Sequence, residues 1–379
     1  MSLFYKYISG LLTILCILKF QDGFATTNDS TNTSRIISSD FPSWFIGAKF
    51  YGGYTFSPYE RIKNLEAHTL DFELIVSKAT FGDKTWQQVH AYPRLGLAIN
   101  YINLGKPEIT GNVLAIIPHL QWHLIGQNAS VLGIRFGTGI GYFNTTFDPL
   151  HNYRDKAIST PINVCLQLNA IYTQKINKYL ELNSGLGVTH FSNGSWKLPN
   201  AGFNIPAIFI GGNYILHQNE TLVHHSAEEL AVKKPYYFYA YSSISFETQG
   251  FNGENHYTIY SLSACVGKQL ARRSKVGIGF DVFYDPTIVT DSAGAITSAK
   301  HPTDNLQAGI KVEHELVLGN LGLITNWGVY ILHPANEYGP FYQILGVKYN
   351  LNPKIFVGTF LKTHYFTADF IQLALGYSF

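Results

Sequence analysis

The chain has 379 residues, of which 46% are hydrophobic, 15% aromatic and 14% charged, and its formal net charge is +2. Soluble domains carry roughly 25% charged residues, so this chain is poor in charge, and its near-neutral balance argues against a nucleic-acid partner. A single Met and 34 Gly are also atypical of a helical bundle or a coiled coil.

The N-terminus has the pattern of a secretory signal peptide. Lys6 precedes an apolar stretch over residues 8–17, and the small residues Gly23 and Ala25 occupy the −3 and −1 positions of a cleavage site. The apolar stretch is too short for a comfortable membrane span. We expect residues 1–25 to be a cleaved signal peptide and residues 26–40, rich in Ser, Thr and Asn, to be a flexible tail.

Strand-like segments recur along the rest of the chain, separated by polar residues, Gly, Asn or Pro. Strands of about 9–11 residues can span a bilayer when tilted, and such a sheet must close because its edges cannot bond to water there. The pattern therefore predicts an all-β, antiparallel fold. The expected strands are 43–55, 67–80, 90–104, 111–125, 129–143, 160–174, 178–191, 203–217, 236–248, 255–270, 273–285, 304–317, 320–333, 340–350, 353–365 and 368–379.

The last twelve residues, ADFIQLALGYSF, alternate between two kinds of side chain. One face would hold Asp369, Ile371, Leu373, Leu375, Tyr377 and Phe379. Alternation is expected of a lipid-facing strand whose other side faces a barrel interior, and a final strand ending in Phe resembles the terminal signal of bacterial outer-membrane barrels. We therefore expect a transmembrane β-barrel in the outer membrane of a Gram-negative bacterium.

A polar segment at residues 218–235 divides the strands into two sets, at 41–217 and 236–379. The sequence NKYLELNSGLGVTHF (177–191) also weakly resembles NPKIFVGTFLKTHYF (352–366), which is compatible with an internal duplication. Two architectures follow: one barrel of about sixteen strands, or two eight-strand units in tandem. Because only the second set ends in the terminal-Phe signal, the single barrel is favoured.

The seventh expected strand ends in an unusual stretch, THFSNGSWKLPNAGFN, at residues 189–204. Side chains alternate across a sheet, so His190 and Ser192 share a face with the apolar residues of that strand and point to lipid. Asn204 shares that outer face on the eighth strand, where Ile208 and Ile210 have the same parity. With both termini in the periplasm, the seventh strand ends at the external surface, at the depth of the lipid headgroups.

This group of side chains has the chemistry of a serine esterase. Ser is a weak nucleophile until a neighbouring base takes its proton, His supplies that base near neutral pH, and a third polar group fixes the His tautomer. Amide and backbone N–H groups in the following loop could bind the oxyanion. The alternative is that His190 is an ordinary interfacial residue followed by an ordinary turn.

The motif resembles the signature of the PagL-type lipid A 3-O-deacylases, or acyloxyacyl hydrolases, over roughly residues 43–217. This resemblance implies an eight-strand outer-membrane barrel with a Ser-His-Glu triad on its lipid-facing surface. It implies Ser192 as the nucleophile, His190 as the general base, and Asn200 with the Gly194 backbone as oxyanion donors, with Asn193 as loop support. The residues that carry the resemblance are His190, Phe191, Ser192, Asn193, Pro199, Asn200 and Gly202.

The sequence departs from the family at the third member of the triad. The family's acid lies fourteen residues after the His, where this sequence has Asn204. An Asn can orient a His, but it supports the imidazolium less than a carboxylate does. Glu181 is a poor substitute because its parity points it inward.

These observations predict an outer-membrane carboxylic-ester hydrolase that removes an ester-linked acyl chain from lipid A in the outer leaflet. No metal or other cofactor is expected, and a homodimer is left open. The alternatives are a non-catalytic barrel, such as a porin or a lipid transporter, and an esterase that acts on phospholipid. One further cluster carries metal-ligand chemistry but is best interpreted as a solvated connector: His224, His225, Glu228 and Glu229.

Overall fold

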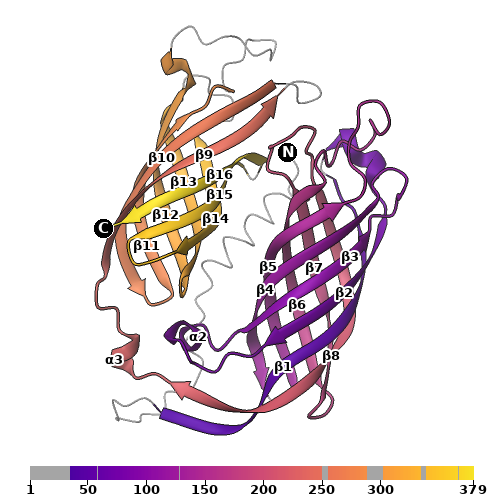
Figure 1. The fold of residues 1–379 in the computed structure, drawn as a ribbon, viewed down its shortest axis with the longest axis vertical. Coiled ribbons are helices and arrows are strands. Elements are labelled where there is room, and N and C mark those ends of the chain that lie inside the picture. The colour runs from indigo at the N-terminus through magenta and orange to yellow at the C-terminus, as the bar shows by residue number, and fades with distance from the viewer. Residues whose placement is uncertain are drawn as a thin grey trace. The chain divides into compact units, whose positions relative to one another are not determined.

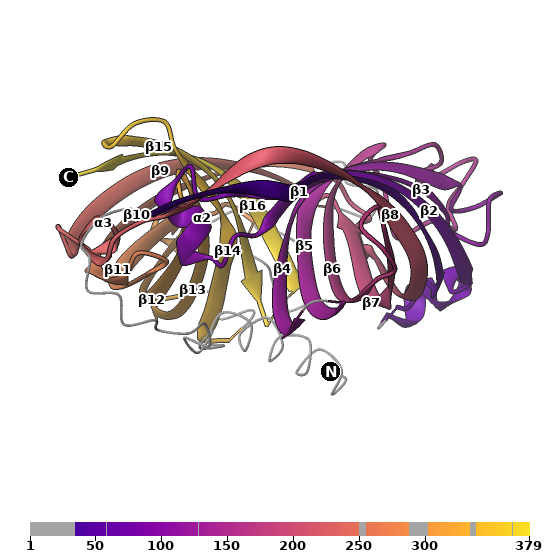
Figure 2. The same cartoon turned by 90° about the horizontal axis from the view of Figure 1, so that it is seen from below.

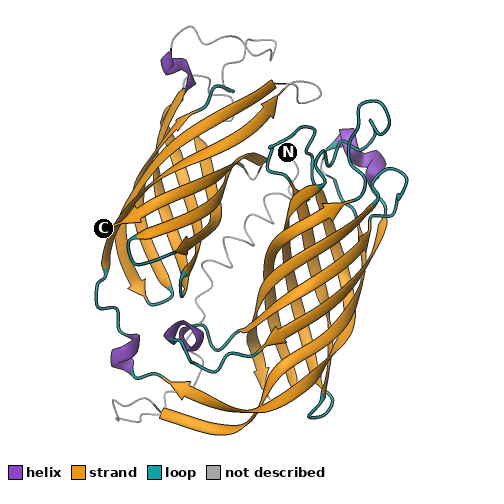
Figure 3. Cartoon of the chain, in the orientation of Figure 1, coloured by secondary structure: helices purple, strands orange, loops and turns teal. Residues whose placement is uncertain are grey.

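The computed structural model describes residues 35–57, 59–127, 129–249, 255–287, 302–333, 339–365 and 367–379. The expected signal peptide at 1–25 and most of the expected tail at 26–40 lie outside the described residues. Strands make up most of the described chain, with a few short helices between them (Figure 3). No helix within these ranges is both long and apolar enough to cross a membrane.

The first set of strands runs from residue 35 to residue 224 (Figure 1). A 3-10 helix, η1 (Glu60–Leu65), and a short helix, α2 (Thr85–Val89), stand in its loops. The strands are β1 (Arg35–Tyr54), β2 (His68–Lys78), β3 (Arg94–Asn103), β4 (Asn112–Gln127), β5 (Ser130–Phe143), β6 (Ile162–Lys175), β7 (Leu180–Ser192) and β8 (Phe203–His224).

The second set follows the short helix α3 (Ala227–Leu230) and includes a 3-10 helix, η2 (Pro302–Asn305). Figure 2 gives a second view of the tilted strands of each set. The strands are β9 (Tyr236–Gln249), β10 (Asn255–Ala271), β11 (Ser274–Tyr284), β12 (Leu306–Leu318), β13 (Leu321–Leu332), β14 (Phe341–Asn350), β15 (Ile355–His364) and β16 (Thr367–Ser378).

The sixteen strands close into two barrels, β1–β8 and β9–β16. β16 returns to β9, with Leu373 opposite Ile244, and Gly47 on β1 lies directly against Gly212 and Asn213 on β8. In each set, the first and last strands therefore pair with each other, and no strand edge is left open. The arrangement is the alternative expectation of two eight-strand units, in place of the favoured single barrel of about sixteen strands, because the alternation of side chains does not specify which edge strands pair.

Two of the expected boundaries are corrected. β1 begins at Arg35, so residues 35–40 extend a strand and do not belong to a tail. β8 continues to His224, which shortens the expected 218–235 connector. Val223 N–H donates a backbone hydrogen bond to Phe81 O (2.8 Å), so the polar end of β8 is held by the segment that follows β2.

Burial alternates along the strands as the sequence predicts for a barrel in lipid. β2 reads exposed–buried throughout, with Leu70 and Leu74 outside and Asp71 and Glu73 inside. Large exposed apolar surfaces are rare on soluble monomers, whereas a membrane barrel places apolar residues outside and polar residues inside. The pattern explains why so hydrophobic a chain buries so many charges.

The lumen of each barrel is filled by side chains, as expected for eight strands. In the first barrel, Glu73 accepts hydrogen bonds from Lys49 Nζ (2.9 Å) and Arg135 Nη2 (2.6 Å), and all three side chains are fully buried. In the second barrel, Lys362 and Tyr342 are equally buried. Neither described lumen is an open channel at these levels.

Candidate active site

The predicted catalytic pair lies at the end of β7, on its outer face. Glu181 and Asn183 are buried while Leu182 and Leu186 are exposed, so odd-numbered residues face the lumen and even-numbered residues face outward. This confirms the predicted parity of the strand. His190 and Ser192 are therefore separated by one inward residue, Phe191, which is completely buried.

Phe191 anchors this end of the strand in the lumen. Its ring packs edge-on against Phe143, with centroids 5.3 Å apart, and Phe143 stacks on Phe203 at 6.1 Å. These rings come from β5, β7 and β8 and belong to an apolar cluster that fills one end of the first barrel. The backbone on which His190 and Ser192 stand is thus fixed from the inside.

His190 is oriented by Asn204 on the neighbouring strand. The two residues are direct cross-strand partners of β7 and β8, and His190 Nδ1 lies 2.8 Å from Asn204 Oδ1. With the amide oxygen as acceptor, Nδ1 carries the proton and donates it to this hydrogen bond, which leaves Nε2 as the basic nitrogen. The third member predicted from the sequence is therefore in contact with the His.

Gly202 keeps the space beside the pair open. A Cβ atom at this position would lie 3.2 Å from His190 Cε1, 3.6 Å from Ser192 Cβ and 2.9 Å from Phe191 O. Its φ of +73° also favours Gly. No hydrogen bond joins Ser192 Oγ to His190 in the described structure, and in enzymes without bound substrate such contacts are often long. The two side chains nevertheless border the same small space.

The loop after Ser192 is held by its two Asn residues. Asn193 N–H donates to Asn200 Oδ1 (3.1 Å), and Asn193 Nδ2 donates to Lys197 O (2.8 Å). Gly194 adopts a left-handed conformation with φ of +61°. With its oxygen occupied by Asn193, Asn200 retains its amide N–H groups as donors, so its side chain both supports the loop and has oxyanion-binding chemistry.

The segment between β5 and β6 also supports this loop, and no pattern in the sequence predicts that support. Asn193 Nδ2 also donates to Ser159 Oγ (3.2 Å) and Thr160 Oγ1 (3.1 Å), and Gly202 N–H donates to Ala157 O (3.0 Å). No local motif marks Ser159 or Thr160, because their role depends on contacts more than thirty residues away along the chain.

The surroundings of the pair are apolar. Leu166 faces His190 across β6 and β7. Leu166 and Val188 are exposed on the outside of the barrel, and Trp196 is exposed in the loop that follows β7. A polar pair set among exposed aliphatic and aromatic side chains is suited to a substrate with hydrocarbon chains rather than to a small soluble molecule.

Two family models match the chain. One, described as lipid A 3-O-deacylase (PagL), matches residues 72–213, and the other, described as acyloxyacyl hydrolase, C-terminal domain, matches residues 235–379. The chain belongs to the PagL family. The first match contains His190, Ser192 and Asn204, and the gap between the two matches contains α3.

Solved structures with low similarity were also found. The crystal structure of the outer membrane enzyme PagL shares 17% identity, with a TM-score of 0.31, over 44% of this chain and 97% of that chain. A triple mutant of the Rhodopseudomonas blastica porin shares 8% identity, with a TM-score of 0.20, over 91% of this chain and 100% of that one. The P. putida toluene transporter TodX shares 9% identity, with a TM-score of 0.19, over 89% of each chain. No curated protein matches significantly.

The second barrel of this PagL-family chain does not repeat the outward His. His364, in the segment that resembles β7, is buried in the lumen, where Tyr330 OH lies 2.8 Å from its Nε2. A shift of one residue along a strand moves a side chain to the opposite face. The sequence similarity between the halves therefore does not extend to the orientation of their His residues.

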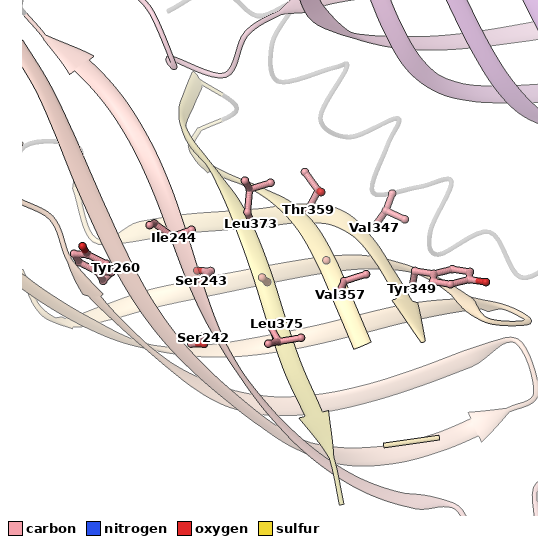
Figure 4. A pocket seen from close by; sticks show the side chains of 12 residues that line it. Ser242, Ser243, Ile244, Tyr260, Val347, Tyr349, Val357, Thr359, Leu373 and Leu375 are labelled. Atoms are coloured by element: carbon pink, nitrogen blue, oxygen red, sulfur yellow. The ribbon is translucent and has the colours of Figure 1, made fainter. Parts of the chain in front are cut away.

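A shallow hollow of about 640 Å³ lies on the second PagL-family barrel (Figure 4). Its lining comes from β9, β10, β14, β15 and β16 and includes the outward side chains Val357, Leu373 and Leu375. None of the predicted site residues contributes to it. We assign this hollow to the apolar outer surface of the barrel.

The four connector residues with metal-ligand chemistry do not converge. His224 Nδ1 lies 3.0 Å from Tyr92 OH, whereas His225 Nδ1 lies 3.7 Å from Glu229 Oε1. Ser226 and Glu229 form a capping box at the start of α3. The Ser226–Glu229 contacts are those of a capped turn, which agrees with the interpretation of this segment as a connector.

Asp155 lies in the segment between β5 and β6 that supports the loop after Ser192, and it should make the stability of the protein depend on pH. It is fully buried, its Oδ1 accepts from Ala157 N–H (3.2 Å), and its Oδ2 has no hydrogen-bond partner among the described residues. Burial raises the pKa of Asp155 to about 7. Because the unfolded value is about 3.9, the native state holds the proton more tightly, and stability should be lost as the pH rises between these two values.

We expect Asp155→Asn to remove this loss, raising the free energy of unfolding at about pH 8 by on the order of a few kcal/mol relative to wild type. Urea unfolding in detergent micelles at about pH 5 and about pH 8 measures the difference. Glu108→Gln, on an exposed loop, is the control. If the free energy of unfolding changes equally between these pH values in wild type and in Asp155→Asn, Asp155 is not the group responsible.

Proposed function

We propose that this chain is an outer-membrane serine esterase that removes an ester-linked acyl chain from lipid A. The observation that carries the proposal is the His190–Asn204 hydrogen bond of 2.8 Å on the outer face of the first barrel, beside Ser192. Membership of the PagL family supports the substrate class. The apolar surroundings of the pair support a substrate that lies in the membrane.

The geometry supports a two-step acyl transfer. Ser192 Oγ attacks the ester carbonyl while His190 Nε2 accepts its proton. The tetrahedral intermediate then expels the alcohol of the ester, whose oxygen takes that proton from His190. Water, activated by His190, attacks the resulting acyl-enzyme and releases a fatty acid and free Ser192. Asn204 keeps Nδ1 protonated throughout and so keeps Nε2 available as the base.

The negative charge of the tetrahedral intermediate requires donors near Ser192. We assign this role to the Asn200 side-chain amide and the Gly194 backbone N–H, with Asn193 holding the loop in shape. Preorganised donors of this kind contribute roughly 3–4 kcal/mol of transition-state stabilisation. The mechanism uses no metal ion at any step.

The filled lumens argue against a porin or a transporter that works through the barrel. In the first barrel, the buried Glu73–Arg135 ion pair and the apolar cluster around Phe143 occupy the interior. A conducting barrel needs a wider, water-filled interior, as in porins of sixteen or more strands. The outer face is therefore the better location for function.

The test is the lipid A of cells that express the protein. Wild type and Ser192→Ala are produced in a Gram-negative host, both are confirmed as folded in the outer membrane, and extracted lipid A is analysed by mass spectrometry. We expect loss of one acyl chain with wild type alone. Unchanged lipid A in both strains would contradict the proposal, and fatty acid released from phospholipid instead would assign a different lipid substrate.

Because Asn204, the third member of the site, is neutral, replacing it should change the rate in either direction. Asn204→Leu removes the hydrogen bond that orients His190 and should lower kcat about 10- to 100-fold, the equivalent of the 1.5–3 kcal/mol of a hydrogen bond to a charged group. Asn204→Asp restores a carboxylate beside the imidazolium and should raise kcat above wild type. Initial rates on purified lipid A in mixed micelles measure both. A rate unaffected by Asn204→Leu would remove Asn204 from the site.

A further inference from the structure

Three carboxylates meet at one end of the second barrel, apart from the predicted active site in the chain. Within the described residues, ligand atoms of Glu247, Asp285 and Asp369 all lie within 4.8 Å of one another. Glu247 is near the end of β9, Asp285 follows β11 and Asp369 is near the start of β16. The group thus lies at the end of the barrel opposite to the C-terminus.

Asp369 reaches this group through an irregularity in β16. By simple alternation it would face outward with Ile371, but the pairing of β15 with β16 slips at this point, from Lys362 opposite Phe370 to Thr363 opposite Ala368. A β-bulge of this kind redirects a side chain. The Asp369 carboxylate consequently bonds the inward Lys362 Nζ (2.6 Å), which corrects its predicted place on the outer face.

Asp285 supplies an oxygen that the protein leaves unsatisfied. Its side chain is 1% exposed, and its Oδ1 accepts from Thr287 N–H (2.9 Å) and Oγ1 (2.6 Å). Its Oδ2 is buried and has no hydrogen-bond partner among the described residues. Buried charged oxygens without a partner are costly, so this atom calls for a cation or another donor.

The local charges leave room for a divalent cation. Three carboxylates lie together here, and Lys362 Nζ bonds one of them, that of Asp369 (2.6 Å). His364 can be neutral in this place. Tyr330 OH can donate to its Nε2 (2.8 Å), while its own Nδ1–H faces Asp369 Oδ2 (3.5 Å). A divalent ion bound here would add the positive charge that clustered carboxylates favour.

We propose that Glu247, Asp285 and Asp369 form a calcium site that ties together the ends of β9, β11 and β16. Calcium binds oxygen ligands at about 2.3–2.6 Å in irregular geometries, so two ligands of one ion lie up to about 5 Å apart. The three ligand atoms lie within 4.8 Å of one another and so satisfy this limit. Thr287 Oγ1, 3.4 Å from Glu247 Oε2, lies close enough to contribute a neutral oxygen. The site is structural and takes no part in acyl transfer at Ser192.

Calorimetric titration of the full chain tests the site. The protein is stripped with EDTA in detergent micelles free of lipopolysaccharide, and CaCl2 alone is the titrant. We expect saturable binding of one Ca²⁺ by wild type, and affinity reduced by more than about tenfold in Glu247→Gln and in Asp285→Asn. Glu228→Gln, which removes an exposed carboxylate on α3, should bind like wild type.

If a variant does not fold, the titration of wild type still tests the proposal, because it shows whether the protein binds Ca²⁺. Folding is checked by the heat-dependent mobility of the barrel on a gel. Absence of saturable Ca²⁺ binding by folded wild type, or equal binding by folded Glu247→Gln and Asp285→Asn, would overturn the site. Because Ser192→Ala should bind Ca²⁺ normally, the result is independent of the proposed esterase.

Discussion

Replacing His190 with Gln is expected to slow ester hydrolysis by about 10²- to 10⁴-fold, the usual contribution of a general base. Without Nε2 to take its proton, Ser192 remains a weak nucleophile. The fold should survive, because the side chain stands outside the barrel and its neighbour Phe191, not His190, fills the lumen. Steady-state rates on purified lipid A in mixed micelles measure the effect.

A matched control and a double variant sharpen this prediction. His68→Gln changes an exposed His at the start of β2, away from the predicted site residues, and should leave the rate unchanged. Ser192→Ala combined with His190→Gln should cost no more than either change alone, because members of one catalytic unit are strongly non-additive. Additive losses would indicate that the two side chains do not act together.

Replacing Glu73 with Gln should destabilise the first barrel by about 3–5 kcal/mol, the usual cost of breaking a buried ion pair. Glu73 accepts from both Lys49 and Arg135, so its loss leaves two buried cations without their shared carboxylate. Adding Lys49→Met should recover part of the loss by removing one of those charges. Urea unfolding in detergent micelles, followed by tryptophan fluorescence, measures the free energy of unfolding.

The control for this measurement is again Glu108→Gln, which removes an exposed carboxylate from the loop between β3 and β4. It should change the free energy of unfolding by less than about 0.5 kcal/mol. If Glu73→Gln is as stable as Glu108→Gln, the ion network does not hold the lumen together, and the apolar cluster around Phe143 must carry that role.

Much of the fold could be predicted because strand alternation is a local property. All sixteen strands lie where the sequence placed them, to within a few residues except at the start of β1 and the end of β8. The parity of β7 alone likewise predicts Glu181 inside and His190 outside, as the structure has them. The pairing that closes each barrel could not be predicted in this way, because it depends on residues far apart in sequence, such as Leu373 and Ile244.

The candidate site likewise has residues that the sequence predicts and residues that it does not. His190, Ser192 and Asn204 follow from a motif and its parity, and the structure joins the first to the third at 2.8 Å. Ser159 and Thr160 could not be found, because they act on Asn193 from another loop. Asp369 was assigned to the wrong face because a bulge interrupts the regular alternation on which that prediction relied.

The outward position of the pair has a kinetic consequence. An active site on the lipid face meets its substrate by lateral diffusion within a two-dimensional film, not by collision from bulk solution. For the proposed esterase, the relevant concentration is therefore the fraction of the membrane or micelle surface occupied by lipid A. Adding inert detergent at constant total substrate should slow the reaction by surface dilution, and a rate that follows bulk molarity instead would place the reacting groups in water.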